Sequence, residues 1–395
     1  MMEWQENGVA HTAHWRSESG VAAPVRVVIA DDTLAADDAW RLACEGTALL
    51  WRGDFQNARH LLEAMMRRVE RKPRHGSRKA RDKVASAAQT VDAEADVQDP
   101  AAAFHRHRLA TLQRARTLGR VLIPLDGDYG IPLRRAPDLR AACTEVWGDA
   151  DGQPSVVSLR ELLGLIGAHQ WRRKGIELLA LGDAAGRSRI HPWYGVFSPV
   201  RGEYIDLVAT VPMAEVDLAF DIGTGTGVIA AVLARRGLPR IVATEIDPRA
   251  VACARENLAR LGVDDRVQVC ETDLWPEGRA GLVVCNPPWI PARPSAPIER
   301  AIYDEESRML RGFLAGLRDH LQPTGEGWLI LSDLAEHLGL RTRAALLAWI
   351  DQAGLQVAGQ HSVKPRHGKA TDPADPLHEA RSKELTTLWR LTAKA

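Results

Sequence analysis

Apolar residues in the first half of the chain follow a helical spacing. From residue 34 to about residue 69 they recur mostly three, four or seven positions apart, which is the period of an amphipathic helix. Gly53-Asp54 interrupts this pattern and predicts two helices rather than one. Residues 101–122 predict a further helix, and residues 25–30 could form a strand. We therefore expect a mainly helical accessory domain over residues 25–189.

The pattern changes at about residue 190, where short apolar runs begin to alternate with segments of helical spacing. Such alternation is typical of a mostly parallel, doubly wound α/β sheet with helices on both faces. The predicted strands cover residues 218–222, 241–246, 267–270, 282–285, 327–332, 356–363 and 385–391. The predicted helices cover residues 228–236, 248–261, 309–320 and 341–353. We expect this domain over residues 190–395, with the last two strands as an antiparallel edge pair and ligands at the carboxyl ends of the strands.

Two segments lie outside these patterns. Residues 1–24 are polar and rich in Gly, Ser and Ala, so we expect a flexible arm. Residues 67–83 contain nine Lys or Arg and two acids, and residues 84–100 then contain four acids and no base. This composition favours a mobile insertion over residues 67–100, with a nucleic-acid or ribosome-binding arm as the alternative. The basic run has no interleaved aromatic residue, which argues against stacking on bases.

Composition narrows the class of protein. Hydrophobic residues make up 45% of the chain and charged residues 26%, as in globular proteins. Basic and acidic residues balance at 51 each, so overall charge predicts no general attraction to nucleic acid or to a membrane. The five cysteines contain no C-x-x-C pair and are expected to be reduced, mostly buried thiols of a cytoplasmic protein. Neither a secretory signal nor an apolar run of membrane-spanning length is recognised.

The first motif with a chemical meaning ends the strand predicted at 218–222. Asp221-Ile222-Gly223-Thr224-Gly225-Thr226-Gly227 places an acid and three glycines at the start of a helix. Glycine permits positive φ and has no Cβ to block a ligand, so this turn can let a cofactor approach the backbone. Dinucleotide-binding folds use a similar turn, but the spacing here is G-x-G-x-G and not G-x-G-x-x-G. The helix N-terminus would face a carboxylate of the ligand.

Carboxylates follow the next two predicted strands. Glu245 ends the second strand, where it can accept hydrogen bonds from both hydroxyls of a ribose. Asp247 lies close by but precedes Pro248, so we interpret it as the N-cap of the next helix. Asp273 follows the third strand, where it can accept the exocyclic amine of adenine. The alternative role of Asp273 is an N-cap or turn aspartate.

Asn286-Pro287-Pro288-Trp289 follows the strand predicted at 282–285. The two prolines remove two backbone donors and leave carbonyls as acceptors. The Asn286 side-chain oxygen and the Pro287 carbonyl can both accept hydrogen bonds from one NH2 group, and Trp289 can stack on a flat acceptor. Holding both hydrogens favours the pyramidal nitrogen that develops in the transition state. The alternative interpretation is a Pro-Pro loop with a capping Asn and a packed Trp.

Further residues are expected near the acceptor. Phe197 and Arg201 precede the first strand of the domain, and Tyr303 ends a Pro-rich loop after the motif. His367 lies in the connector at 364–383, between the last two strands. If the first of these strands is parallel to the central ones, the connector lies on the ligand side and can act as a substrate lid. The histidines have no metal-ligand spacing, so no metal is expected.

With these motifs, residues 195–290 resemble a class I S-adenosylmethionine-dependent methyltransferase. The resemblance rests on the glycine turn, residues 244–248, Asp273-Leu274 and residues 286–290. It is strongest to N-methyltransferases that act on glutamine side chains of release factors or on exocyclic amines of nucleic-acid bases. Residues 195–199 resemble the rRNA guanine group, whereas 286–290 are nearer the release-factor group, which usually has Tyr in place of Trp289. The N-terminal 185 residues resemble neither group's accessory domain.

The resemblance implies a Rossmann-like sheet of seven strands, S-adenosyl-L-methionine as cofactor and S-adenosyl-L-homocysteine as product. The implied cofactor-binding residues are Asp221, Gly223, Thr224, Gly225, Gly227, Glu245, Ile246, Asp273, Leu274 and Asn286. The implied catalytic residues are Asn286, Pro287, Pro288 and Trp289, and the implied substrate-binding residues are Phe197, Arg201, Trp289, Tyr303 and His367.

The expected function is N-methylation of a planar, NH2-bearing nitrogen. A protein glutamine side chain is the first expected acceptor, a base in rRNA, tRNA or DNA the second, and a small metabolite the third. An inactive cofactor-binding scaffold is the non-enzyme alternative.

Overall fold

The computed structural model describes residues 1–70, 99–182, 188–200, 202–295, 297–366 and 372–395. The chain forms two compact units, Met1–Gln170 and Trp171–Ala395, and each is described by itself. The division falls before the boundary expected at 189/190, since Ile176, Ile190 and Val196 all pack in cores of the second unit. Within the described ranges, no helix is long and apolar enough to cross a membrane.

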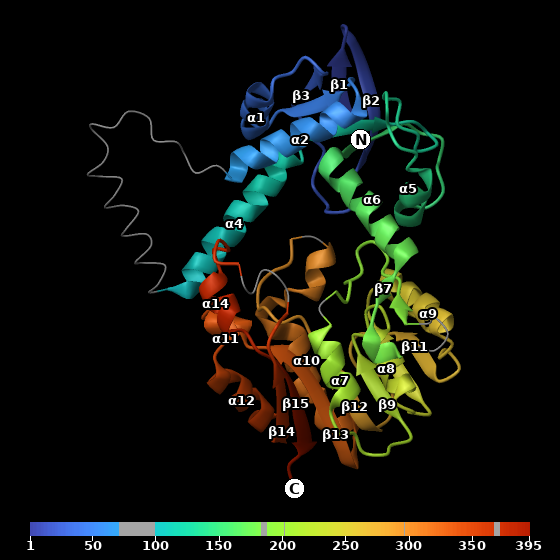
Figure 1. The fold of residues 1–395 in the computed structure, drawn as a ribbon, viewed down its shortest axis with the longest axis vertical. Coiled ribbons are helices and arrows are strands. Elements are labelled where there is room, and N and C mark those ends of the chain that lie inside the picture. Colours follow the sequence, from blue (N-terminus) through green and yellow to red (C-terminus); the bar gives the residue numbers. More distant parts are fainter. Residues whose placement is uncertain (71–98, 183–187, 201, 296, 367–371) are drawn as a thin grey trace, which may run out of the picture. The chain divides into compact units, whose positions relative to one another are not determined.

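The second unit contains a seven-stranded sheet with the spatial order β11-β10-β9-β12-β13-β15-β14 (Figure 1). Its strands are β9 Ala219–Ile222, β10 Ile241–Glu245, β11 Val267–Glu271, β12 Ala280–Cys285, β13 Leu321–Ser332, β14 Leu355–Val363 and β15 Thr386–Ala393. Neighbours are parallel from β11 to β13, and β15 is antiparallel to both β13 and β14. The predicted doubly wound sheet of seven strands and its antiparallel edge pair are confirmed. A separate two-stranded sheet joins β7 Ile176–Glu177 to β8 Arg189–Ile190.

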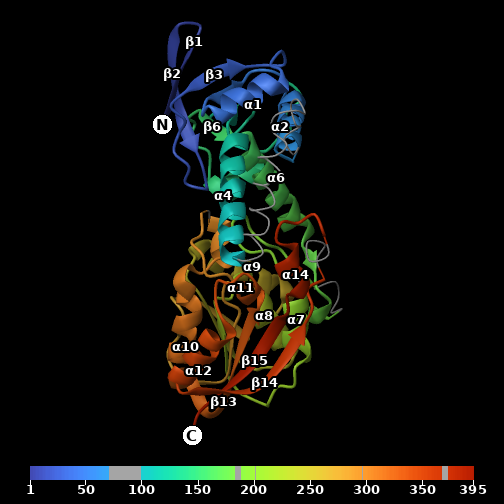
Figure 2. The same ribbon diagram turned by 90° about the vertical axis from the view of Figure 1, so that its left-hand side faces the viewer.

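Helices cover both faces of the seven-stranded sheet, as Figure 2 shows for α7 on one side and α10 and α12 on the other. The first face carries α7 Glu203–Thr210, α8 Val228–Arg235 and α9 Pro248–Leu261, and the second carries α10 Arg308–His320 and α12 Arg343–Gln352. Shorter pieces are α11 Leu334–His337, α14 His378–Lys383, η1 Leu179–Leu181, η2 Pro297–Ala301 and η3 Glu305–Ser307. The predicted helix at 248–261 coincides with α9.

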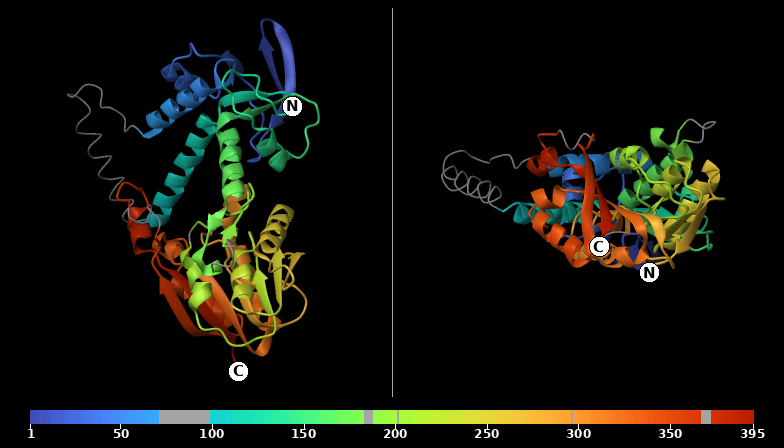
Figure 3. Two further views of the ribbon diagram at one scale, coloured as in Figure 1. Left: turned by 45° about the vertical axis from the view of Figure 1, so that its right-hand side comes forward. Right: turned by 90° about the horizontal axis from the view of Figure 1, so that it is seen from below.

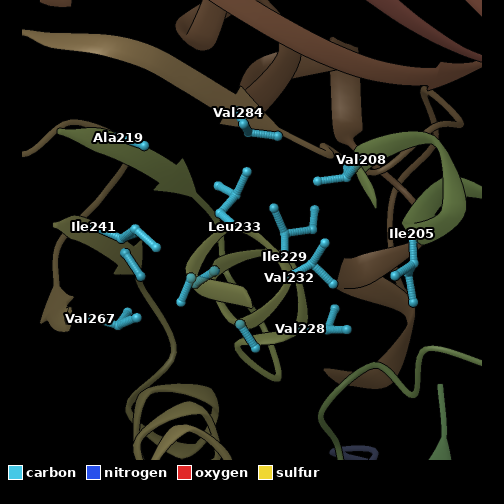
Figure 4. Packing of buried hydrophobic residues seen from close by; sticks show 14 of the residues in the cluster. Ile205, Val208, Ala219, Val228, Ile229, Val232, Leu233, Ile241, Val267 and Val284 are labelled. Carbon is cyan, nitrogen blue, oxygen red and sulfur yellow. The ribbon is translucent and has the colours of Figure 1, made fainter. Parts of the chain in front are cut away.

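The central helix α8 explains how this sheet is buried. All of its residues from Val228 to Ala234 are buried, so it is apolar on every side. Its side chains pack between the sheet and α7, where they meet Val208 (Figure 4). Strands covered on both faces appear in the sequence as continuous apolar runs, which is why β9, β10 and β12 could be predicted from the sequence.

The winding of the sheet reverses between β9 and β12. From β9 the chain adds β10 and then β11 on one side, and it returns to place β12 on the other side of β9. Ile222 at the end of β9 pairs with Cys285 at the end of β12. The glycine turn and Asn286 therefore leave the same edge side by side, at the position where doubly wound sheets bind ligands.

The direction of β14 decides on which side of the sheet the following connector begins. Since β14 and β13 are both antiparallel to β15, β14 runs parallel to the central strands. Val363 and Ser332 both pair with Thr386, so the connector that follows β14 starts at the edge where the central parallel strands end. Arg366 of this connector forms an ion pair with Asp206 of α7 at 3.7 Å. Residues 367–371, including His367, lie outside the described residues.

The first unit contains a six-stranded sheet with the order β1-β2-β6-β5-β4-β3, which the prediction of a mainly helical domain had omitted. Its strands are β1 Met2–Glu6, β2 Val9–Arg16, β3 Val27–Ala30, β4 Ala48–Trp51, β5 Val121–Leu125 and β6 Ser155–Ser158. Its helices are α1 Ala36–Cys44, α2 Phe55–Glu70, α4 Pro100–Leu118, α5 Arg140–Trp147 and α6 Leu159–Lys174. Every residue of β4, β5 and β6 is buried. Buried runs of four or five residues have no visible alternation, so periodicity does not separate them from helix.

The flexible arm expected at residues 1–24 is wrong for its first sixteen residues. β1 and β2 form an antiparallel hairpin near the N-terminus (Figure 3), and β2 also pairs with β6. Met2 is buried, and Trp4 stacks on His11 across the hairpin. The turn residues Asn7 and Gly8 both have positive φ, 52° and 79°. Asn-Gly is a strong hairpin signal and could have revealed this element from the sequence.

The charged insertion predicted at 67–100 falls almost entirely on residues 71–98, which lie outside the described residues. Its first residues continue α2, and its last residues begin α4, where Asp99 caps the helix by accepting a hydrogen bond from the Ala102 amide.

The five cysteines form no disulfide, and Cys143, Cys253 and Cys285 are buried. The expectation of mostly buried thiols is thus confirmed.

Candidate functional site

The glycine turn between β9 and α8 is held against the neighbouring strand β10. The amides of Gly223 and Thr224 both donate to the Thr244 carbonyl at 2.9 Å. Gly223, Gly225 and Gly227 have φ of 71°, 57° and 81°, a region that favours glycine. A Cβ on Gly227 would lie 3.3 Å from Leu258 of α9, whereas a Cβ on Gly225 would meet no atom within 4 Å. The turn therefore leaves open space in front of Gly225 and packs tightly at Gly227.

Asp221 is fully buried below this turn. Its Oδ2 accepts hydrogen bonds from the Thr224 hydroxyl at 2.6 Å and from the Ala230 amide at 3.1 Å. Burial raises the pKa of Asp221 to about 7, against the opposing effect of these two donors. Asp221 thus ties the turn to the first residues of α8.

Glu245 lies at the end of β10, directly beside the turn. Its Oε2 accepts from the Gly225 amide at 3.0 Å, and its Oε1 accepts from the amides of Ile246 and Asp247 at 2.9 and 3.1 Å. Burial raises the pKa of Glu245, while the three amides oppose the shift. A carboxylate has about four acceptor positions, so at least one remains for a ligand.

Asp247 caps the helix α9, as expected from the sequence. Its Oδ1 accepts from the Arg249 amide at 2.9 Å at the N-cap of α9, and Pro248 is the first helical residue. The N-cap interpretation of Asp247 is confirmed. Ile246 between the two acids is 56% exposed, so its side chain is available at the edge beside Glu245.

Asp273 and Leu274 lie in the loop that follows β11. The Asp273 carboxylate is exposed and forms an ion pair with Arg308, at 3.2 Å between Oδ2 and Nη1. Leu274 has a φ of 66°, and its carbonyl accepts from the Thr244 hydroxyl at 2.6 Å. Thr244 thus contacts both the glycine turn and this loop. The carboxylates of Glu245 and Asp273 follow neighbouring parallel strands at the same edge.

The Asn286–Trp289 motif begins where β12 ends, next to the glycine turn. The Trp289 indole Nε1 donates to Asn286 Oδ1 at 2.8 Å. An indole N–H is only a donor, so this contact assigns the oxygen of the Asn286 amide to that position. Pro287 is buried, and the half-buried Trp289 packs against the cores of both sheet faces. The motif is therefore anchored at the sheet edge.

The loop after the motif returns to it. Ile290 and Tyr303 form a parallel backbone bridge, in which the Ile290 amide donates to the Ile302 carbonyl at 3.2 Å and the Asp304 amide donates to the Ile290 carbonyl at 2.9 Å. The backbone of the half-buried Tyr303 thus lies beside the residue that follows Trp289. Asp304 itself is buried and accepts from the amides of Met309 and Leu310 at 3.0 and 3.1 Å.

Phe197 is half-buried in a segment that packs on α9. Its neighbour Val196 joins Ala250 and Cys253 in a small core, and a Cβ on Gly195 would lie 3.1 Å from the Arg249 guanidinium. These contacts lie at the first turns of α9, which begins just after Glu245. Phe197 directly follows Val196 in this segment, its role toward a substrate stays a prediction, and Arg201 lies outside the described residues.

Sequence reasoning missed four residues at this edge: Thr244, Asp304, Arg308 and Met309. The partners of Thr244, Arg308 and Met309 are distant in sequence, so no local spacing marks these residues. Asp304 accepts from backbone amides five and six residues away, which no pattern of side chains reveals. Thr244 could have been suspected as a hydroxyl at the end of a buried strand. For metal binding, no group of three or more His, Cys, Asp or Glu side chains gathers anywhere in the described ranges.

The family model described as "Methyltransferase small domain" matches residues 194–343. The chain is 31% identical to a tRNA1(Val) (adenine(37)-N6)-methyltransferase of Shewanella amazonensis, over 38% of this chain and 71% of that protein. It is 38% identical to a release factor glutamine methyltransferase of Cereibacter sphaeroides, over 31% of this chain and 41% of that protein. A ribosomal protein L11 methyltransferase of Pelotomaculum thermopropionicum is 49% identical over 17% of this chain and 22% of that protein.

The chain spans between 22% and 53% of the length of four curated relatives that it matches, so it covers only part of each. Among solved structures, a methyltransferase from Pyrococcus furiosus is similar with a TM-score of 0.37 and 17% identity, over 58% of this chain and 98% of that one.

Replacing Asp221 by Asn should change how stability depends on pH. The pKa of Asp221 is 3.8 in its ordinary state and about 7 in the folded protein. Between these values the folded protein binds more protons than the unfolded chain, so this group lowers the stability of the wild type as pH rises through the window. The Asp221→Asn variant lacks this linkage, and its free energy of unfolding should fall less over the same range in urea titrations.

Asp217→Asn is the matched control, because Asp217 is an exposed acid just before the same strand. It should follow the wild type at every pH. Parallel curves for Asp221→Asn and the wild type would contradict the assignment of a proton to Asp221.

Proposed function

Because this chain belongs to the family of the methyltransferase small domain, we propose that it transfers a methyl group from S-adenosylmethionine to a planar, NH2-bearing nitrogen. The observation that carries the proposal is the adjacency of the glycine turn and Asn286 at the reversal point of the sheet. A methyl donor bound at the first and an amine held at the second would meet across one sheet edge.

The described residues fit the donor. Open space in front of Gly225 lets a ligand reach the turn backbone, and the N-terminus of α8 favours a carboxylate there. Glu245 has an acceptor position left for a ribose hydroxyl, and the exposed Asp273 can accept an adenine amine. Ile246 and Leu274 would border the adenosine. When bound, the sulfonium of the cofactor supplies an activated methyl group, so the protein's task is alignment and exclusion of water.

The acceptor site would be formed by Asn286 and Pro287. The oxygen of the Asn286 amide has two lone pairs, and Trp289 uses one of them, which leaves one for an NH2 group. The Pro287 carbonyl would accept the second hydrogen. Trp289 thereby fixes the amide orientation, in addition to the stacking expected of it. Pro288 stiffens the loop, and Phe197, Arg201, Tyr303 and His367 are proposed as surrounding substrate contacts.

We infer that a glutamine side chain of a protein is the first acceptor to test, since the Asn286–Ile290 segment is nearest to that group of enzymes. A base amine of a nucleic acid is the second, and one observation favours it. α4 carries Arg106, Arg108, Arg114 and Arg116 and no acid, and it leaves Arg114 and Arg116 exposed. A basic helix of this kind is suited to a phosphate backbone.

Labelled S-adenosylmethionine in cell extract, followed by separate protease and nuclease digestion, distinguishes these acceptors. Label that protease renders soluble and nuclease leaves intact supports a protein acceptor, and the reverse supports a nucleic acid. Absence of transfer to any macromolecule or metabolite, beside a positive control enzyme in the same extract, would contradict methyltransferase activity.

Glu245→Ala should weaken binding of S-adenosylhomocysteine by about tenfold or more, because hydrogen bonds to a charged group contribute roughly 1.5–3 kcal/mol. Isothermal titration calorimetry measures the effect. Glu271→Ala is the matched control, since Glu271 pairs with Glu245 across β10 and β11 and is exposed. Equal affinities for Glu245→Ala and the control would remove Glu245 from the donor site.

Asn286→Ala should reduce kcat by about 100-fold or more and leave the Kd of the cofactor nearly unchanged, because its oxygen acts on the nitrogen as charge develops. Trp289→Phe keeps an aromatic ring but removes the N–H that orients Asn286, so it should reduce kcat by a smaller factor. Single-turnover transfer measures both variants. Near wild-type turnover in Asn286→Ala would show that the acceptor is held elsewhere.

A further inference from the structure

The segment from Tyr303 to Leu310, here called the 303–310 segment, contacts the loops that follow β9, β11 and β12. Through its bridge to Ile290 it contacts the loop that follows the acceptor motif. Met309 lies against the glycine turn, where a Cβ on Gly223 would come within 2.4 Å of the Met309 methyl carbon. Arg308 contacts the loop after β11 through Asp273. One short segment therefore reaches both the donor side and the acceptor side.

This segment is held firmly at both ends. Asp304 is buried and accepts hydrogen bonds from the amides of Met309 and Leu310, which closes the segment into a tight turn. Leu310 is fully buried in the core on the α10 face. Between them, Glu306 and Ser307 both have a φ of 55°, a left-handed conformation that costs energy for residues other than glycine. Two consecutive residues of this kind place Arg308 where it meets Asp273.

The guanidinium of Arg308 faces both oxygens of Asp273, at 3.2 Å from Nη1 to Oδ2 and 3.5 Å from Nη2 to Oδ1. A forked contact of this kind restricts the rotation of the carboxylate. It uses about two of the roughly four acceptor positions of the carboxylate and leaves the others for a further donor. The guanidinium can therefore orient Asp273 while the same carboxylate receives an amine.

We propose that Arg308 is a positioning residue of the donor site, which holds the Asp273 carboxylate in the orientation that accepts the exocyclic amine of adenine. The proposal rests on the proposed function, because it assumes an adenosine-containing ligand at this edge. Met309 and Asp304 keep Arg308 in place from the two sides of the segment. Both partners of the ion pair are exposed, so the effect of Arg308 is modest and depends on salt.

The test is calorimetric titration of the full-length protein with S-adenosylhomocysteine. Arg308→Ala should raise the Kd about two- to fivefold at low salt, which corresponds to the range measured for exposed ion pairs. The increase should shrink at high ionic strength. Arg308→Lys should recover part of the affinity, because an ammonium retains the charge but lacks the fork. Arg240→Ala is the matched control and should bind like the wild type, because Arg240 is an exposed arginine just before β10.

A double mutant separates positioning through Asp273 from any other role. Asp273→Asn should weaken binding by itself, and adding Arg308→Ala should then change the Kd no further. With activity as the readout, Arg308→Ala should raise the KM for S-adenosylmethionine and leave kcat at saturating cofactor unchanged. A structural defect would lower kcat or the thermal midpoint together with the affinity.

The outcomes separate the two proposals. If the wild type does not bind S-adenosylhomocysteine, the proposed function fails and the role of Arg308 fails with it. If the wild type binds but Arg308→Ala leaves the Kd unchanged, or acts equally in the Asp273→Asn background, only the role of Arg308 is overturned. Tighter binding by Arg308→Ala would show that the guanidinium competes with the ligand, which also overturns positioning.

Discussion

The parallel pairing of β9 with β12 is the contact on which the candidate site depends. Ile222 and Cys285 are paired at the ends of these strands, so the glycine turn and Asn286 leave the sheet as neighbours. Because β10 and β11 lie on the other side of β9, Glu245 and Asp273 extend the same edge away from Asn286.

Burial divides four similar carboxylates at this edge between two tasks. Asp221 and Asp304 are buried, and burial raises the pKa of each while hydroxyl or amide donors oppose the shift. They hold the glycine turn and the 303–310 segment. Glu245 and Asp273 are the two proposed ligand contacts, and the first accepts from three amides while the second lies opposite Arg308. The same chemical group therefore supports the local structure in two positions and is proposed to face the ligand in the other two.

The secondary structure was predicted best where strands and helices alternate over a long stretch of the chain. α9 and the β9, β10 and β12 strands were predicted close to their bounds, because layers of helix and sheet repeat a long and regular pattern. β4 and β6 were missed, since short buried runs look alike in strand and helix. Glu245 and Asp247 could be separated from sequence because Pro248 marks a helix start. Arg308 and Met309 could not be recognised, as their partners lie far away along the chain.

The sequence by itself determined the two motifs and the kind of group that each presents, because glycine, proline and amide chemistry is local to a few residues. Tertiary structure alone decided which acids are buried, that Trp289 orients Asn286, and that Arg308 meets Asp273. It also decided that the N-terminal hairpin pairs with β6 in a larger sheet. These outcomes depend on which distant strands become neighbours, and that choice is made by packing across the whole unit rather than by any local spacing.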